Sequence, residues 1–247
     1  MPLVRTVLVL EGNDDFDADA LPVFAKGMPA LFCRFDKRAS DVEIDIELTL
    51  HGEYIPENSL AVDQHTTIIA YFFVPFAITG LFDVDAGELL KKPVALSNWS
   101  PHKYNALRTQ LIYALLVSEK LEVLDHLLLQ QQLENSNALE IIQCTTDQIL
   151  YDPHYTQLSK LLTSLAINKR SFQRIFKKYV GVTPSQYRRI CQFQGSFEQV
   201  RAGQFDKMSD VAFDNGFADQ SHFIRSFKEF ANTTPNEYVQ NGIAGKK

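Results

Sequence analysis

The chain has 247 residues, of which 45 % are hydrophobic and 22 % are charged, and its formal net charge is −6. This length allows one large core or two smaller ones, and no apolar run approaches the ~20 residues of a membrane span. The composition is that of an ordinary globular protein without transmembrane helices. The N-terminal run MPLVRTVLVLEG lacks a small-residue cleavage site, so we interpret it as a strand and not as a signal peptide.

Three cysteines, Cys33, Cys144 and Cys191, are scattered along the chain. An odd number without close spacing indicates free thiols in a reducing compartment. No CxxC or paired-histidine spacing occurs, so we expect no metal and no cofactor.

The first 80 residues predict a small antiparallel sheet or barrel. β-Prone runs occupy Thr6–Leu10, Ala30–Phe35, Val42–Leu50 and Thr66–Val74. The third run alternates apolar residues with mostly acidic ones, which is the period of a strand with one solvated face. The fourth run is continuously apolar and rich in β-branched and aromatic residues, which predicts a place in the sheet interior.

From Phe76 to about Leu150 the apolar period becomes helical. Short helical pieces are expected around Gly80 and Gly87, followed by a break at 99–101. Leucines then recur at helical spacing: Leu107, Leu111, Leu115, Leu121, Leu124 and Leu128. These helices either pack on the sheet or form a dimer seam. After a polar loop at 130–137, Asn137 is a predicted N-cap for helix 138–150, and a linker follows at 151–153.

The stretch Asp210–Phe230 predicts a helix-turn-helix. Val211 and Ala212 lie on the buried face of a first helix, Asn215-Gly216 suits the positive φ of a tight turn, and Asp219 suits an N-cap. On the second helix Phe223 and Phe227 face inward together. The residues left facing outward are Gln220, Ser221, His222 and Arg225. Such a polar front suits the DNA major groove.

A second copy of this unit lies upstream. At an offset of 51 residues, Asn168 corresponds to Asp219, Phe172 to Phe223, Arg174 to Arg225, Phe176 to Phe227, Lys177 to Lys228, Tyr179 to Phe230, Thr183-Pro184 to Thr234-Pro235, and Tyr187 to Tyr238. Before the turn the offset is 50, which pairs Leu158 with Met208, Leu161 with Val211, Leu162 with Ala212 and Ala166 with Gly216. Matches in register over this length indicate an internal repeat.

A long helix connects the two copies. Thr183 is its predicted N-cap, Pro184 lies in its first turn, and Gly203 follows its end near residue 202. About 18 residues span roughly 27 Å, and major-groove faces on one side of B-DNA recur every ~34 Å. One chain can therefore present two helices to adjacent major grooves.

Charge is divided unevenly along the chain. Residues 151–247 hold 14 Lys+Arg and 8 Asp+Glu, whereas residues 1–150 hold 10 and 22. The basic part can meet phosphates, and we expect the acidic part to face away from DNA.

Residues 151–242 resemble the DNA-binding domain of the AraC/XylS transcriptional regulators. The runs that carry the likeness are RSFQRIFKKYVGVTPSQY and GFADQSHFIRSFK followed by TTPNEY. The N-terminal half resembles, more weakly, the domain that precedes it in a subgroup, at Leu21–Leu31 and Phe72–Asp85. The resemblance implies a bacterial, cytoplasmic, sequence-specific DNA binder. In this family N-terminal domains sense a small molecule, form a dimer, or both.

The predicted fold class is α+β. We expect a β-rich sensor or dimerisation domain at 1–100, a helical linker subdomain at 101–150, and a DNA-binding domain at 151–242. The two helix-turn-helix units of that domain are predicted at about 156–180 and 207–231.

Family contact positions carry over residue by residue. The expected base contacts are Arg170, Gln173 and Arg174 in the first unit, and Ser221 and Arg225, with Gln220 and His222 beside them, in the second. Arg can fork onto guanine and Gln onto adenine, so the first unit is expected to carry more sequence information. Expected phosphate contacts are Lys177, Lys178 and Lys228. The chain departs from the family pattern at Leu162, Ala166, Gln192 and Ser196.

The leading functional hypothesis is a transcriptional regulator that binds two adjacent major grooves of double-stranded DNA, as a monomer or homodimer and with RNA polymerase as a further partner. A small-molecule effector would act on the N-terminal domain. Six residues either line its pocket or are ordinary core aromatics and surface histidines: His51, His65, Phe72, Phe73, Phe76 and Trp99. One alternative is a regulator without a ligand, controlled by a protein partner or by abundance. A remote one is a repair methyltransferase that uses Cys33.

Overall fold

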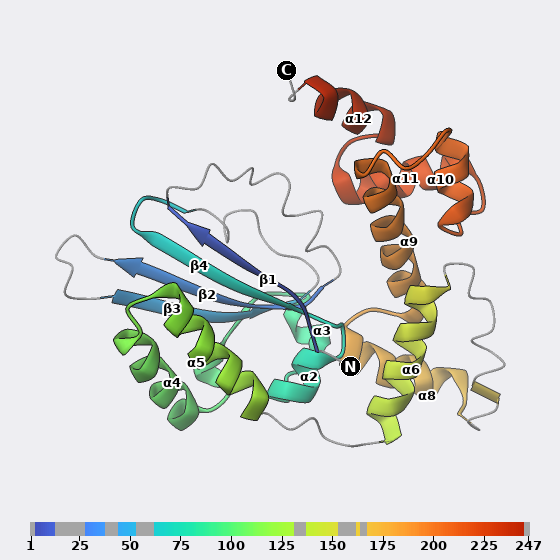
Figure 1. Ribbon diagram of the computed structural model, residues 1–247. Helices are drawn as coiled ribbons and strands as arrows, with labels where there is room; N and C mark the ends of the chain where they lie inside the picture. The colour runs from blue at the N-terminus through green and yellow to red at the C-terminus, as the bar shows by residue number, and fades with distance from the viewer. Residues whose placement is uncertain are drawn as a thin grey trace.

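The computed structural model describes residues 3–12, 28–37, 44–52, 62–130, 137–152, 162–163 and 167–244. Figure 1 shows an N-terminal sheet flanked by helices, next to a stack of helices that ends at the C-terminus. The fold is α+β, as the sequence predicts.

The sheet has five strands in the described part of the chain. They are β1 (Val4–Glu11), β2 (Ala30–Lys37), β3 (Ile44–His51), β4 (Thr66–Phe73) and β5 (Val94–Ala95). Their order is β1-β4-β2-β3-β5, and every neighbouring pair is antiparallel. The four β-prone runs of the sequence thus each form a strand.

The two faces of the sheet bury different clusters of side chains. On β4, Ile69, Tyr71 and Phe73 face the large core under the helices, whereas Ile68 and Phe72 face a smaller cluster on the other side. β4 lies between β1 and β2 in the sheet, and its side chains are buried on both faces, which confirms the interior position predicted from its continuous apolar run.

Helices follow β4 in the chain, with β5 between α3 and η2. They are α2 (Ala77–Phe82), α3 (Ala86–Leu89), the 3-10 turn η2 (Leu96–Asn98), α4 (Pro101–Tyr113), α5 (Val117–Gln130) and α6 (Asn137–Tyr151). Leu107, Leu111 and Leu124 are buried in the large core, so the packing hypothesis is confirmed for them. Leu115 and Leu129 instead remain exposed.

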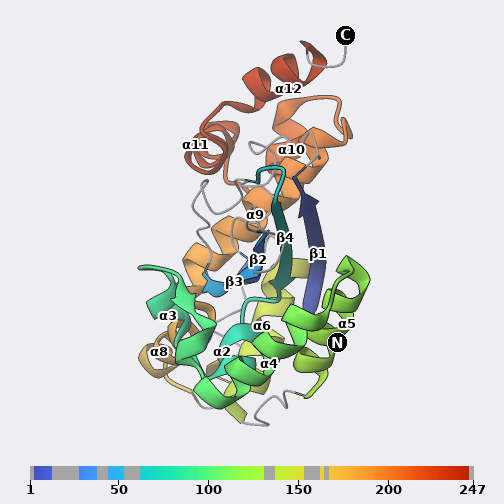
Figure 2. The same cartoon turned by 90° about the vertical axis from the view of Figure 1, so that its left-hand side faces the viewer.

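The C-terminal helices are α8 (Lys169–Val180), α9 (Pro184–Arg201), α10 (Met208–Asp214), α11 (Gln220–Ala231) and α12 (Pro235–Ala244). The connecting helix α9 has the 18 residues expected from the sequence. In Figure 2 it leads from α8, beside α2 and α3, to the α10–α12 group. The predicted first helix of unit 1 lies outside the described residues except for 162–163, as do the loop at 131–136 and the linker beyond residue 152.

The C-terminal helices pack in two different apolar clusters. Phe172, Phe176 and Val180 of α8 belong to the same core as the sheet and α2–α6. Phe197, Phe223 and Phe227 belong to a separate cluster whose members all lie between residues 193 and 239. The two clusters meet within α9, whereas the domain boundary near residue 151 stays a prediction from the sequence.

Candidate nucleic-acid interface

The two recognition helices begin with the same capping interaction. The Asn168 Oδ1 atom accepts a hydrogen bond from the Ser171 N–H at 2.8 Å. The Asp219 Oδ1 atom accepts one from the His222 N–H at 2.7 Å. Both residues have extended backbone angles and satisfy an otherwise unpaired N–H of the first turn. Each N-cap predicted from the repeat is therefore confirmed.

The turns before these helices also match. The Ile167 N–H donates to the Leu162 carbonyl at 3.0 Å, and the Phe217 N–H donates to the Ala212 carbonyl at 3.0 Å. In the second unit Gly216 has φ +72°, while Asn215 has φ −97°. The positive φ expected of the Asn-Gly pair thus falls on the glycine alone, where no Cβ opposes it.

A Thr-Pro pair follows each recognition helix and starts the next one. Thr183 forms a capping box with Gln186, in which each side chain bonds the other residue's N–H. Thr234 and Glu237 do the same at 2.8 and 3.3 Å, and these bonds lower the pKa of the Glu237 carboxyl. Caps and turns therefore repeat as faithfully as the residues that form them.

Each recognition helix buries a pair of phenylalanines four residues apart. Phe172 and Phe176 are at most 1 % exposed, and their ring centroids lie 5.6 Å apart. Phe223 and Phe227 are fully buried, with centroids 5.8 Å apart. The buried Phe pair determines which face of each helix points inward, and therefore which side chains are exposed.

Nine of the ten predicted DNA contacts are exposed: Arg170, Gln173, Arg174, Lys177, Lys178, Gln220, Ser221, Arg225 and Lys228. His222 differs, because it is half-buried and its ring packs edge-on against Phe217 at 5.3 Å. It was expected to face fully outward, and its ring is instead partly used to pack the turn onto α11. Its contact with DNA stays a prediction.

The helix α9 fixes unit 2 through polar bonds that the sequence did not reveal. Gln192, one of the positions that depart from the family pattern, is buried, and its Nε2 donates to the Gly216 carbonyl at 2.6 Å. Asn215 donates to Gln199 Oε1 at 2.7 Å and to the Val211 carbonyl at 2.9 Å. Gln192 therefore positions the turn of unit 2.

A salt bridge joins α9 to α11 at the surface. Arg189 Nη2 lies 2.5 Å from Glu229 Oε2. Gly195 lies where α9 passes the turn, and a Cβ there would clash with Asn215 Oδ1. The close approach at Gly195 and the polar bonds from α9 together hold unit 2 firmly against the second half of α9.

The first recognition helix is held differently, by the N-terminal domain. The Thr79 hydroxyl, on α2, donates to the carbonyls of Lys178 and Tyr179 at 3.4 and 3.5 Å. Gly181, which ends α8 with φ +91°, lies so close to α3 that a Cβ would be 3.1 Å from the Ala86 carbonyl oxygen. No local pattern in the sequence indicated this contact, because it joins residues about 100 positions apart.

The two units also differ in charge. Residues 156–180 contain six Lys/Arg and no Asp/Glu, while residues 207–231 contain three and four. Positive charge is therefore concentrated in unit 1.

The residues considered for an effector pocket do not converge on one site. Phe73 and Phe76 lie in the large core, whereas Phe72 and His51 contact Phe32 on the other face of the sheet. His65 is exposed, and Trp99 packs edge-on against Phe82 at 5.2 Å. Most of the six are thus core or surface residues.

Two findings bear on the enzyme alternative. Cys33 is fully buried on β2, and burial raises the pKa of its thiol far above the usual range, which opposes the thiolate that accepts a methyl group. Among the described residues, no group of three His, Cys, Asp or Glu side chains could hold a metal ion.

In the same part of the chain, no helix is both long and apolar enough to cross a membrane.

Comparison with known proteins places this geometry in a family. A model of a helix-turn-helix domain matches residues 161–241. A probable transcription factor, PqrA of Proteus vulgaris, is 38 % identical over 77 residues, which cover 30 % of this chain and 61 % of that protein. The TetD protein of transposon Tn10 from Escherichia coli is 31 % identical over 101 residues, covering 39 % of this chain and 72 % of TetD.

An HTH-type transcriptional regulator of Haemophilus influenzae is 26 % identical over 110 residues, which cover 44 % of this chain and 34 % of that protein. The match thus spans about a third of this relative and three fifths of PqrA.

Among solved structures, fatty-acid-bound ToxT from Vibrio cholerae is 14 % identical with a TM-score of 0.42, covering 97 % of this chain and 96 % of ToxT. The C-terminal domain of AraT, a response regulator from Geobacillus stearothermophilus, is 17 % identical with a TM-score of 0.39, covering 43 % of this chain and 88 % of that domain. From its helix-turn-helix match and its relatives, the chain belongs to the AraC family of helix-turn-helix transcriptional regulators.

Proposed function

We propose that this chain is a sequence-specific DNA-binding regulator of transcription whose two units read adjacent major grooves. One observation carries the proposal: two helix-turn-helix units with matching caps lie at the two ends of an 18-residue helix, each with a buried Phe pair and a polar outer face. A helix of that length spans roughly 27 Å, close to the ~34 Å repeat of the major groove.

In unit 1, Arg170, Gln173 and Arg174 are the proposed base readers. In unit 2 these are Ser221 and Arg225, with Gln220 and His222 beside them. Arg and Gln make bidentate contacts to guanine and adenine, whereas Ser discriminates little between bases. Unit 1 is therefore proposed to specify more of the operator than unit 2 does.

The proposed phosphate contacts are Lys177, Lys178 and Lys228. All three occupy the last turns of their helices, beyond the proposed base-reading positions. Such contacts orient the protein on the duplex without selecting a sequence.

The test is selection of bound duplexes from a random DNA pool by the whole chain, with Arg174→Ala and Arg225→Ala in parallel. We expect a motif of two segments about one helical turn apart, relaxed at a different segment by each variant, with a loss of about 1–3 kcal/mol in each case. Arg108→Ala on α4, in the N-terminal half, is the matched control and should leave the motif unchanged. No enrichment by the wild-type chain at low salt would refute the proposal.

Control through the N-terminal domain is the second part of the proposal. A small-molecule effector bound there would shift the population of DNA-competent molecules; the alternative is control by a protein partner or by abundance. The shared core of α8 and the sheet supports this coupling, since a change on one side alters packing on the other. Unchanged DNA affinity and thermal stability across a metabolite panel would favour the alternative.

In this role the protein would act in the bacterial cytoplasm, on double-stranded DNA and beside RNA polymerase. One chain carries both reading units, so a monomer suffices for two grooves, and a homodimer would cover four. Sedimentation of the protein on a duplex that holds one selected site distinguishes these stoichiometries.

A further inference from the structure

A network of side-chain amides joins the connecting helix α9 to the turn of unit 2. Gln199 donates from Nε2 to Asp214 Oδ2 at 3.0 Å, and its Oε1 accepts from Asn215 Nδ2 at 2.7 Å. About two turns earlier on the same helix, Gln192 donates to the Gly216 carbonyl at 2.6 Å. Two separate points of α9 thus hold the segment in which α10 ends and the turn begins.

The segment held in this way leads directly into the recognition helix α11. Gly216 precedes Gln220, the first residue of that helix, by only a few positions. Within the turn, the ring of Phe217 packs against the ring of His222 at 5.3 Å. The first residues of a recognition helix are those that contact base edges in helix-turn-helix proteins. A shift of the Gly216 carbonyl would therefore move Ser221 and its neighbours relative to the bases.

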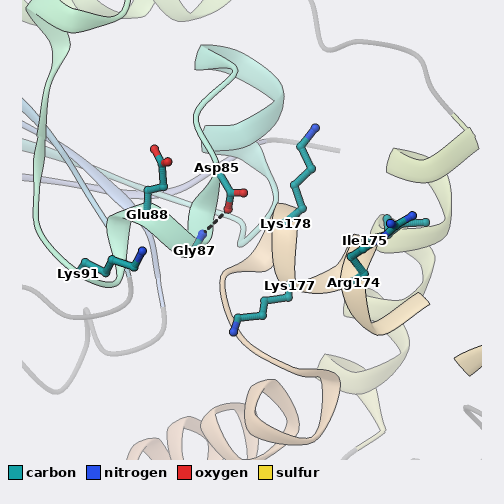
Figure 3. Close-up of a pocket in the computed structure, with 8 residues that line it drawn as sticks. All are labelled: Asp85, Gly87, Glu88, Lys91, Arg174, Ile175, Lys177 and Lys178. Carbon is teal, nitrogen blue, oxygen red and sulfur yellow. Dashed lines mark hydrogen bonds between the residues drawn. The ribbon is translucent and has the colours of Figure 1, made fainter. Parts of the chain in front are cut away.

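Unit 1 has an apolar residue at the corresponding place. At the offset of 50 residues, Leu165 corresponds to Asn215, and a leucine side chain cannot bond to an amide. Figure 3 shows the side of α8 that lies beside α3, where the hydrogen bond drawn joins the Gly87 N–H to Asp85 within the α3 segment. The residues of α8 on that side are Arg174, Ile175, Lys177 and Lys178. An amide bond to α9 from this position of the turn is therefore possible only in unit 2.

Apolar packing also holds α11 against α9, but it is less directional. Phe193 and Phe197 of α9 lie 5.6 and 5.8 Å from Phe227, measured between ring centroids. Burial of apolar surface has no preferred direction, whereas a hydrogen bond weakens steeply as its angle departs from linear. Gln192 and Asn215 are buried, so a bond lost there is not readily replaced by water. The amide network therefore selects one setting of α11 on α9.

We propose that Gln192 and Gln199 are positioning residues that set the spacing between the two DNA segments read by the chain. The inference rests on the proposed DNA-binding function. At its other end α9 is fixed to unit 1 by the cap at Thr183 and by Tyr187, whose ring lies 5.9 Å from that of Phe176. One extra base pair moves the second segment by ~3.4 Å along the duplex and ~35° around it, which is more than hydrogen bonds to bases permit. One fixed setting of α11 therefore selects one spacing.

The test uses the whole chain with Gln192→Met or Gln199→Met. Methionine is similar to glutamine in length and helix propensity but has no N–H donor. Ser196→Ala is the matched control, because Ser196 is buried on the same helix and its hydroxyl donates to the Phe193 carbonyl within α9 at 2.8 Å. Hydrogen exchange shows whether α11 stays folded in each variant. If the buried Gln192→Met unfolds it, the half-buried Gln199→Met provides the test.

The probes are fluorescent duplexes that carry the two segments enriched by the wild-type chain. One has the enriched spacing, and the others have one base pair added or removed. We expect the wild-type chain to prefer the enriched spacing by at least about tenfold in affinity. Each Met variant should reduce that ratio to about threefold or less, because a loosely held α11 accepts neighbouring spacings, whereas Ser196→Ala should retain the wild-type ratio.

A purely structural role of the two glutamines would weaken binding at every spacing alike. A wild-type ratio in the Met variants, or an equal decrease in Ser196→Ala, would therefore overturn the positioning role while leaving the DNA-binding function intact. A wild-type chain that binds all spacings equally would overturn it as well. Failure of the wild-type chain to enrich any sequence would refute the function and the inference together.

Discussion

The two helix-turn-helix units have the same local construction and different surroundings. Each has an N-cap on its recognition helix, a buried Phe pair and a Thr-Pro capping box. Unit 2 completes its core with its own residues and with α9, whereas α8 of unit 1 completes its core against the sheet and α2–α6. Similar sequence thus sets similar helices, whereas the cores in which those helices pack differ.

The largest expected effect comes from truncating the buried Phe in each unit. Phe176→Ala and Phe227→Ala should each cost about 3–5 kcal/mol. Phe176 lies in the core shared with the sheet, so its loss should lower the main unfolding transition. Phe227 lies in the separate cluster, so its loss should release α10–α12 and leave the sheet folded. Hydrogen exchange during denaturation measures both losses of stability. Identical exchange patterns for Phe176→Ala and Phe227→Ala would contradict the division of the helices between two clusters.

Acidification should weaken the sheet side selectively. His51 is buried with Nδ1 unpaired, and burial lowers its pKa from 6.5 to about 4. The unfolded chain therefore binds the proton first, so stability is present above pH ~6.5 and falls, by up to about 3 kcal/mol, as the pH drops toward 4. His51→Phe, beside Phe32, should flatten this dependence. Because α8 shares the large core with the sheet, it should lose exchange protection with the sheet at low pH.

Removing the N-caps should cost less, about 1 kcal/mol each. Asn168→Ala should lower the free energy of unfolding of the sheet and α8 together. Asp219→Ala should lower only the free energy of opening of α11. Asn168→Asp and Asp219→Asn, which keep an acceptor at the cap, are the matched controls. Thermal melts combined with exchange of the two helices separate the two outcomes, and an equal loss in both regions from either variant would argue against separate units.

The smallest effects concern phosphate contacts. Lys177→Ala and Lys228→Ala should each reduce the salt dependence of DNA affinity by about one unit of slope. A titration of affinity against salt provides the slope, and a slope that either variant leaves at the wild-type value would contradict the phosphate contact of that lysine.

The sequence predicts those features that depend on nearby residues. The strands, the 18 residues of α9 and the caps at Asn168, Thr183 and Asp219 follow from periodicity and from turns of three to five residues. The contact of Thr79 with Lys178 and the burial of His51 do not, because they depend on segments that meet only in the folded chain. Gln192 shows the limit most clearly, since its residue type permits either a DNA contact or the bond to Gly216 that the structure contains.

Hydrogen exchange of the whole chain in mild denaturant tests the central claim most directly, because it reports the opening of α8 and α11 separately. The claim is that α8 of unit 1 packs in the core of the sheet, whereas unit 2 is built around a separate cluster that it shares with α9. We expect α11 to open at low denaturant while α8 stays protected together with β2, β3 and β4. If α8 and α11 open together while the sheet remains protected, the two units form one independent domain, and the shared core of α8 and the sheet is contradicted.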